Sequence, residues 1–348
     1  MATNNNGNGN GNGKQPINKA SNHEIMNHVR ANASQEYQNN VPVATAENAT
    51  ATGLALTTYT PSMNEFVNVL VNKIAMTIVS SKLARNKLAP FKAGTLPYGK
   101  DIEEVFVDLA AKATFDPVVA ETEVFKRVLP NVKAIFHREN RRDFYKVTVS
   151  QDMLKKAFLN NTGLGEMVSS IVQSLYSADI NDEYKLMKEL MTEYGVAGNF
   201  TTVTSVKPVD TASAKKLAQD IKKTVTQMSF MSTAFNKQGV NTYSDPEDLV
   251  LFLIPEVSIL FDTELLAFAF NSDKFDFKTQ IVLLDNFGTN LPKTQAILVD
   301  KKWFQVYDTN FEAQSIFNPQ NLSWNYFVHH WQTLSTSQFA NAVKFDTV

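Results

Sequence analysis

Residues 163–194 read GLGEMVSSIVQSLYSADINDEYKLMKELMTEY, and this stretch decides the fold because it predicts one long helix without an internal proline. At a rise of about 1.5 Å per residue the helix would run about 45 Å. Apolar residues recur mostly at a spacing of three to four and predict one buried stripe, made of Met167, Ile171, Leu175, Ala178, Leu186 and Leu190. We expect arms before this helix and a compact domain after it.

The composition limits the classes of protein to which the chain can belong. It has 348 residues, 43% of them hydrophobic, and a formal net charge of −2. This hydrophobic content suffices for one large core or two modest ones. The net charge argues against a protein that binds nucleic acid over its whole surface, although a local basic patch remains open. The absence of cysteine excludes disulfides and thiolate chemistry. With no signal-like run and no apolar stretch of about 20 residues, we expect a soluble protein without a membrane partner.

Residues 1–60 are polar and predict a flexible N-terminal arm. Asn4, Asn5 and Asn6 are followed by an alternation of glycine and asparagine from Gly7 to Gly13, and this segment has no apolar face to bury. Beyond them, Ile25, Met26 and Val29 are compatible with a short helix, followed by an extended arm through residues 41–43. Two interpretations stay open: an arm that orders on a neighbouring molecule, or a solvated tail.

Residues 61–93 predict the first firm helix, and residues 94–150 an extended β excursion. Ser62 and Glu65 have the spacing of a capping box, and the helix is expected to end near Asn86. Strands are predicted at 102–109, 132–136 and 144–149, with an irregular segment at 113–130. Because an isolated two-stranded ribbon is marginal in water, we expect a partner surface to hold it.

The remaining chain predicts a mixed helical and stranded unit. A short helix is expected over 150–159, before the long helix. Asp210 or Thr211 caps a helix whose buried residues are Leu217, Ile221, Val225 and Met228. We then expect strands at 249–254, 281–284, 296–299 and 303–307, a helix at 256–270 with Ile259, Leu260, Leu265 and Leu266 inward, and a closing aromatic segment at 323–348. The 303–307 strand is predicted to pair with 296–299 through the turn at 300–302.

No pattern in the sequence predicts a catalytic, cofactor or metal residue. His23 and His28 are five apart, whereas two ligands on one helix face stand four apart. His329 and His330 are adjacent, so on a strand they point to opposite faces. Gly163-Leu164-Gly165 lacks the third glycine of a dinucleotide motif and is better explained as a loop-to-helix junction. An enzyme that uses carboxylates in the second unit is therefore a minority hypothesis.

The densest basic cluster consists of Arg138, Arg141 and Arg142. One interpretation is a carboxylate clamp on a neighbouring subunit, and the other is a solvated hairpin turn. The complete set of candidate contacts between subunits is Arg138, Arg141, Arg142, Glu121, Glu123, Lys126 and Arg127.

The order of these elements resembles that of the major capsid proteins of tailed phages, which have the Hong Kong 97-type fold. The segment LVLFLIPEVSILFDTELLAFAFNSDKFDFKTQIVLLDNF, residues 249–287, is similar to the corresponding stretch of major head proteins of small phi29-type podoviruses. The resemblance implies an α+β capsid fold with an N-terminal arm, an extended loop, a spine helix, and peripheral and axial domains. These would be residues 1–60 (arm), 61–93 (first peripheral helix), 94–150 (extended loop), 151–199 (spine region), 200–305 (axial) and 306–348 (returning peripheral strands).

The resemblance also implies a function without catalysis. The chain would assemble as pentamers and hexamers into an icosahedral or prolate shell around double-stranded DNA, made in the host bacterial cytoplasm. Expected partners are copies of itself, a separate scaffolding protein, a portal protein, minor or decoration proteins, and DNA held by non-specific contact. Residues 1–60 are too short and too little helical for a fused scaffold, and the tail after Tyr307 is too short for an added immunoglobulin-like domain. The alternative function is an encapsulin-like compartment shell.

Overall fold

The computed structural model describes residues 21–77, 85–97, 99–110, 112, 116–117, 127–160, 163–262 and 279–347. Several expectations lie outside these residues. They concern the Asn/Gly-rich segment, the continuation of the first helix to Ile78 and beyond, the inward packing of Leu265 and Leu266, and the candidate contacts Glu121, Glu123 and Lys126. In the described part, no helix is both long and apolar enough to span a bilayer.

The chain forms two compact units, and each is assembled from three separate segments. Unit 1 comprises residues 1–84, 143–180 and 311–329, and unit 2 comprises residues 85–142, 181–310 and 330–348. The long helix α7 (Gly163–Val196) contributes residues to both units. The sequence placed the start of this helix correctly, and its end lies two residues beyond Tyr194.

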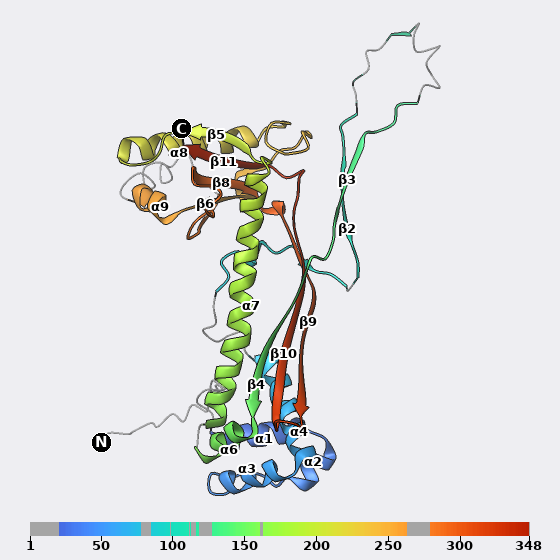
Figure 1. Ribbon diagram of the computed structural model, residues 1–348. Coiled ribbons are helices and arrows are strands. Elements are labelled where there is room, and N and C mark those ends of the chain that lie inside the picture. The colour runs from blue at the N-terminus through green and yellow to red at the C-terminus, as the bar shows by residue number, and fades with distance from the viewer. Residues whose placement is uncertain are drawn as a thin grey trace, which may run out of the picture. The chain divides into compact units, whose positions relative to one another are not determined.

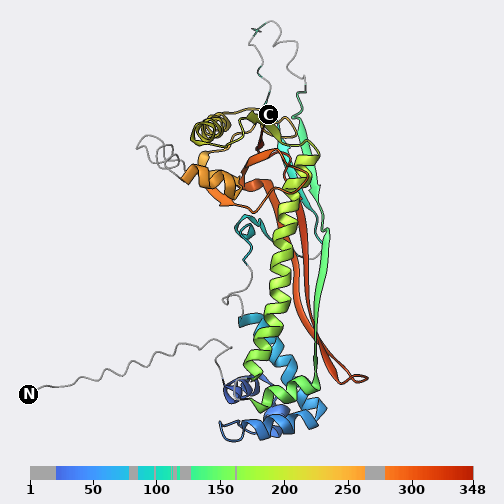
Figure 2. The same cartoon turned by 60° about the vertical axis from the view of Figure 1, so that its left-hand side comes forward.

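Unit 1 gathers short helices around the first part of α7 (Figures 1 and 2). The helices are α1 (Asn22–Asn32), α2 (Gln35–Asn40), α3 (Ala49–Thr58), α4 (Thr60–Thr77) and α6 (Gln151–Leu159). Ile25, Met26 and Val29 of α1 are buried in the same core as Phe66 and Phe158. The expectation of a flexible arm is therefore wrong for residues 21–60, because a few apolar side chains on short helices suffice to anchor this polar segment.

The first residues of α4 and α7 show which polar groups hold the helix ends. Glu65 does not close a capping box with Ser62. Its carboxylate instead accepts hydrogen bonds from the backbone N–H of Ser34 at 2.5 Å and from the Ser34 hydroxyl at 3.0 Å, and α4 starts at Thr60. At the start of α7 the amide of Leu164 donates to Asn22 Oδ1 at 3.1 Å, as expected of a loop-to-helix junction rather than a phosphate site.

A four-stranded sheet has the order β1-β9-β10-β4. Its strands are β1 (Gly94–Thr95), β9 (Phe304–Asn318), β10 (Ser323–Thr336) and β4 (Arg141–Ser150). In unit 1, Trp324, Tyr326 and Val328 alternate along β10 and turn toward the core. β9 thus pairs with β1 and β10, and the predicted pairing of residues 303–307 with residues 296–299 is wrong; the short helix η5 (Lys301–Trp303) leads the chain into the other sheet.

Unit 2 contains a five-stranded sheet with the order β5-β11-β8-β6-β7 (Figure 1). Its strands are β5 (Thr201–Ser205), β6 (Leu249–Leu253), β7 (Gln280–Leu283), β8 (Thr294–Asp300) and β11 (Ala342–Thr347). β6 and β8 are buried on both faces, as the continuous apolar run at residues 249–253 predicted. β11 lies between β5 and β8, so residues 342–347 belong to this sheet and not to the returning strands expected over residues 306–348.

Helices cover both faces of this sheet. One face packs on α8 (Thr211–Met228) and α9 (Pro255–Asp262), and the other on the second part of α7 with Phe91 and Trp303. Asp210 caps α8 as predicted, by accepting from the Ser213 amide at 2.8 Å. Ile259 was expected inward but is 65% exposed. Two further short helices among the described residues are η3 (Ala89–Phe91) and η4 (Pro246–Asp248).

Candidate functional site

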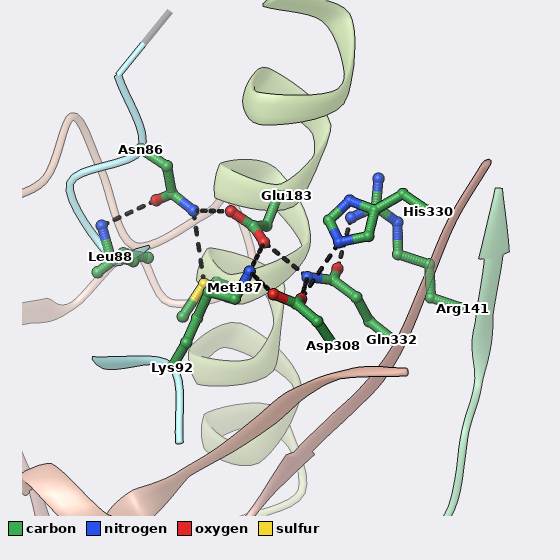
Figure 3. Close-up of polar contacts among 9 residues, drawn as sticks. All are labelled: Asn86, Leu88, Lys92, Arg141, Glu183, Met187, Asp308, His330 and Gln332. Atoms are coloured by element: carbon green, nitrogen blue, oxygen red, sulfur yellow. Dashed lines mark hydrogen bonds and ion pairs between the residues drawn. The ribbon is translucent and has the colours of Figure 1, made fainter. Parts of the chain in front are cut away.

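A connected set of polar side chains lies in unit 2 where α7, β4, β9, β10 and the segment before β1 come together (Figure 3). Glu183 projects from α7, Asp308 from β9, and His330 and Gln332 from β10, while Lys92 comes from the segment before β1. Glu183, His330 and Gln332 are buried, and Gln332 has no exposed surface. We call these residues, together with Asn86 and Arg141, the junction cluster.

The Lys92 ammonium group bridges the two carboxylates of the junction cluster. Its Nζ lies 2.7 Å from Glu183 Oε1 and 2.6 Å from Asp308 Oδ2. Gln332 Nε2 donates to the same two side chains, at 2.6 Å to Glu183 Oε1 and 2.6 Å to Asp308 Oδ1. Each carboxylate therefore has two neighbouring donors, a cation and an amide.

Further contacts extend the cluster to three more side chains (Figure 3). Asn86 Nδ2 donates to Glu183 Oε2 at 2.7 Å, and His330 Nε2 lies 3.2 Å from Asp308 Oδ1. Arg141 Nη1 donates to Gln332 Oε1 at 2.5 Å. The oxygens and nitrogens of the cluster are thus linked into one network, which is the condition under which buried charges are tolerated.

The network keeps its acidic groups ionised. Burial alone would raise the pKa of Asp308, but hydrogen bonds from His330, Lys92 and Gln332 outweigh it and hold the pKa well below its usual value. Burial acts in the same way on Glu183, and the charge of Lys92 with bonds from Lys92, Asn86 and Gln332 lowers its pKa. Burial would lower the pKa of Lys92, yet the two carboxylates raise it.

The cluster has the ligand types of a metal site but already contains its own cation. Ligand atoms of Glu183, Asp308 and His330 all lie within 4.8 Å of one another. The Lys92 ammonium occupies the position between the carboxylates that a divalent ion would need. The arrangement therefore suits a structural role, in which charge attraction fixes a helix to two strands.

The sequence did not predict this cluster, because its members are far apart along the chain and each has an ordinary polar setting. Glu183 is not part of the buried stripe that the sequence predicted for the long helix. The buried line of α7 in unit 2 instead follows Glu183, Met187, Met191 and Tyr194, and Leu186 and Leu190 are only partly buried. The four-residue spacing of Met187 and Met191 is the feature of the sequence that could have revealed this buried line.

The β2–β3 hairpin is docked on one face only. β2 (Ile102–Val107) pairs antiparallel with β3 (Val132–His137), as predicted. On one face Glu104 accepts from the Ser337 hydroxyl at 2.5 Å and lies 3.1 Å from His137 Nε2, and the Phe106 ring contacts the Phe339 ring at 5.6 Å. This face is held by the segment that leads into β11.

The opposite face of the hairpin is exposed and mostly apolar, with Glu103 as its charged residue opposite Phe136. Val105, Val107, Val132 and Phe136 alternate along the two strands and are each more than half exposed. The register pairs Val107 with Val132 directly across the ribbon, so these side chains form one continuous strip. We call these four residues the hairpin strip.

The predicted arginine cluster divides into three environments. Arg138 is exposed, with its Nε 2.9 Å from Asp101 Oδ2. Arg142 contacts Glu139 and lies over the Trp331 ring at 5.0 Å. Arg141 is buried and bonded to Gln332 inside the chain, so its assignment to a solvated turn or to a contact between subunits does not fit this structure. Arg127 is exposed.

The remaining candidates also have structural surroundings. His23 Nδ1 lies 2.9 Å from the Ser21 hydroxyl oxygen, and His28 is exposed on the same helix. His329 contacts the Phe144 ring at 5.7 Å. A carboxylate used as a catalytic acid needs a raised pKa, whereas Glu183 and Asp308 have lowered values. The minority hypothesis of a carboxylate enzyme gains no support from these groups.

Comparisons with known proteins match this chain over almost its whole length. The family model for the Phi29-like phage major capsid protein matches residues 26–346. The chain is 37% identical over 340 residues to the major capsid protein of Bacillus phage B103, which covers 96% of this chain and 75% of that protein. It is 28% identical over 341 residues to the major capsid protein of Streptococcus phage Cp-1, covering 92% of this chain and 93% of that protein.

Solved structures show the same fold at much lower sequence identity. A chain in the capsid structure of Staphylococcus phage Andhra has a TM-score of 0.61 at 13% identity, covering 78% of this chain and 87% of that chain. A chain in a structure of native bacteriophage P68 has a TM-score of 0.59 at 13% identity, covering 78% and 86%. At such identity the likeness concerns the fold.

Proposed function

Because the chain belongs to the Phi29-like phage major capsid protein family, we propose that it assembles as pentamers and hexamers into the closed shell that encloses double-stranded phage DNA. The expected α+β capsid fold of the Hong Kong 97 type is confirmed by the solved phage capsids that match. The chain is a structural component of a phage capsid, and we assign it no catalytic role.

The observation that carries the assembly proposal is the hairpin strip. Exposed apolar ribbons are a liability in a monomer, since they aggregate unless another surface covers them. The docked face of the hairpin is occupied by polar and aromatic contacts within unit 2, so the strip is the side that remains for a neighbouring copy. Repetition of that contact around a symmetric ring would give a closed capsomer.

We extend the proposal to the parts of the fold and to the partners. Residues 94–150 act as the extended loop, residues 151–199 contain the spine helix, and residues 200–305 form most of the axial domain, to which β11 adds one strand. A separate scaffolding protein, a portal protein, minor or decoration proteins and the packaged DNA are the proposed partners, with assembly in the bacterial cytoplasm. The exposed arginines Arg138 and Arg142, together with Arg127, Glu121, Glu123 and Lys126, remain proposed contacts between copies.

Assembly can be tested by expressing the full chain with its scaffolding protein. Sedimentation and negative-stain microscopy should detect capsomers or shells. A protein that stays a monodisperse monomer under these conditions would contradict the proposal. The alternative of a compartment shell predicts shells that form without scaffold and retain a cargo peptide, which a pull-down from the native host would detect.

A further inference from the structure

Helix α8 carries a concentration of positive charge within unit 2. Lys215, Lys216, Lys222 and Lys223 all lie on this helix, and Asp220 is the only acidic side chain among residues 211–228. The whole chain, in contrast, has a formal net charge of −2. The net charge of α8 is therefore positive, although the net charge of the whole chain is slightly negative.

The helix geometry places these lysines on one side. At about 100° per residue, Lys215 and Lys222 share one direction and Lys216 and Lys223 share another about 100° away. Each pair is separated by two turns, or about 10.5 Å along the axis. Residues Ala214, Leu217, Ile221, Val225 and Met228 occupy the opposite side and are buried against the sheet. We call the lysine-bearing side the α8 ridge.

The packing and end contacts of α8 fix the orientation of the α8 ridge. The buried side is part of the core that includes Leu251, Leu298 and Phe345. At the N-terminus, Asp210 and Ser213 form a reciprocal capping box. Asp220 pairs with Lys216 at 3.3 Å and accepts from Ser205 at 2.8 Å, so it lies at the edge of the ridge. Lys215, Lys216 and Lys223 are exposed, and Lys222 is partly exposed.

The composition of the ridge favours a polyanion over a protein partner. The residues between the lysines on this side are Ala212, Gln219 and Thr226, and none of them offers a large apolar anchor. Interfaces between proteins are enriched in aromatic residues, methionine and arginine and are depleted in lysine. Flexible lysine side chains spaced along a rigid rod instead suit phosphate groups, which they neutralise without a fixed geometry.

We propose that the α8 ridge contacts the phosphate backbone of double-stranded DNA without reading its sequence. The inference rests on the proposed function, since a shell that encloses DNA presents one of its surfaces to a dense array of phosphates. Because the chain as a whole carries a small negative net charge, binding to DNA requires a local concentration of positive charge. No base-specific contact is needed, so binding depends on salt and is independent of sequence.

The test is a salt titration of DNA binding by the full-length, unassembled protein. A labelled DNA duplex of random sequence is titrated by fluorescence anisotropy between 50 and 200 mM salt. The ridge variant replaces Lys215, Lys216, Lys222 and Lys223 by Gln. The control variant makes the same change at four exposed lysines elsewhere: Lys156, Lys185, Lys237 and Lys302. Circular dichroism establishes that both variants are folded.

If all four lysines contact phosphates, the slope of log K against log salt falls by about 3.6 in the ridge variant, at about 0.9 per phosphate. That difference corresponds to about 10²-fold in affinity across this salt range. The control variant keeps the slope of the unsubstituted protein. An unchanged slope in the ridge variant, or an equal loss in both variants, overturns the proposal.

The same variants distinguish DNA binding by the α8 ridge from a role of its lysines in shell assembly. A ridge variant that assembles normally with scaffold but binds DNA weakly supports the proposal. A ridge variant that keeps its DNA slope but no longer assembles overturns it and assigns the lysines to a contact between protein copies. Failure of the unsubstituted protein to assemble would count against the proposed shell function. The DNA titration alone decides whether the α8 ridge contacts DNA.

Discussion

Lys92 is the residue on which the junction cluster depends, because it provides the positive charge between Glu183 and Asp308. Removing one partner of a buried ion pair typically lowers stability by about 3–5 kcal/mol, since the remaining charge is left without compensation. Lys92 is partly exposed, which moderates this value. Gln332 would still donate to both carboxylates, but an amide carries no net charge to offset theirs.

The junction cluster predicts loss of stability in acid. Glu183 and Asp308 have folded pKa values below their unfolded values of about 4, so their contribution is complete above pH 4 and is lost as the pH falls through the folded values. Lys92 has a raised pKa, so its contribution is lost only in strong alkali. Urea unfolding between pH 6 and pH 3 measures the effect. Asp308→Asn should reduce the slope of stability against pH, and an unchanged slope would contradict the assignment.

Gly53 is a second residue whose role depends on packing. It lies inside α3, where alanine would favour the helix by about 1 kcal/mol. A Cβ at this position would lie 2.2 Å from Phe158 Cδ1, so the ring or the helix must move. Because overpacking costs about 1–3 kcal/mol, Gly53→Ala should lower the free energy of unfolding despite the better propensity. Thermal unfolding measures it, and Phe158→Leu in the same chain should recover part of the loss.

At the scale of elements, the sequence predicted best those segments whose period or punctuation was strong. The long helix, the hairpin strands, β6 and the cap of α8 were found because residues 163–194 lack proline, apolar runs alternate, and Asp210 precedes an amphipathic segment. Local chemistry determines such features, so a single sequence carries them.

The elements that sequence reasoning missed depend on contacts between distant segments. α1 is polar along most of its surface, and only its packing against Phe66 and Phe158 makes it part of a core. Glu65 has the spacing of a capping box but bonds to Ser34, which is 31 residues earlier. The junction cluster joins Lys92, Glu183 and Asp308 in the same way. No local pattern reports such pairs.

Helix α7 predicts a sharp difference between two substitutions. Leu175 is buried in unit 1, and proline there would remove a helix hydrogen bond and break the rod, at about 3 kcal/mol or more. Leu175→Pro should therefore abolish shell formation. Lys185→Ala removes an exposed side chain with one surface ion pair and should be tolerated. Sedimentation of both variants with scaffold is the measurement, and normal shells from the proline variant would contradict the role given to α7.

At the scale of the whole molecule, substitutions in the hairpin strip are expected to change assembly without changing the stability of the fold. Val105→Ser combined with Phe136→Ser changes only exposed side chains, so the thermal midpoint of the unassembled chain should stay within about 2 °C of the original. Shell yield should fall strongly, because the apolar contact with a neighbouring copy is lost. Calorimetry and microscopy measure the two quantities. Equal shell yield would show that the strip is not a contact between copies.

The position of β11 in the middle of the five-stranded sheet has a consequence for synthesis. β5, β6, β7 and β8 all leave the ribosome before residues 342–347, yet β11 must enter between β5 and β8 to join them. The sheet of unit 2 therefore cannot close before residues 342–347 have been synthesised. A chain interrupted before residue 342 would lack the strand that unites the sheet, so β5 would have no partner strand and β8 would keep one unpaired edge.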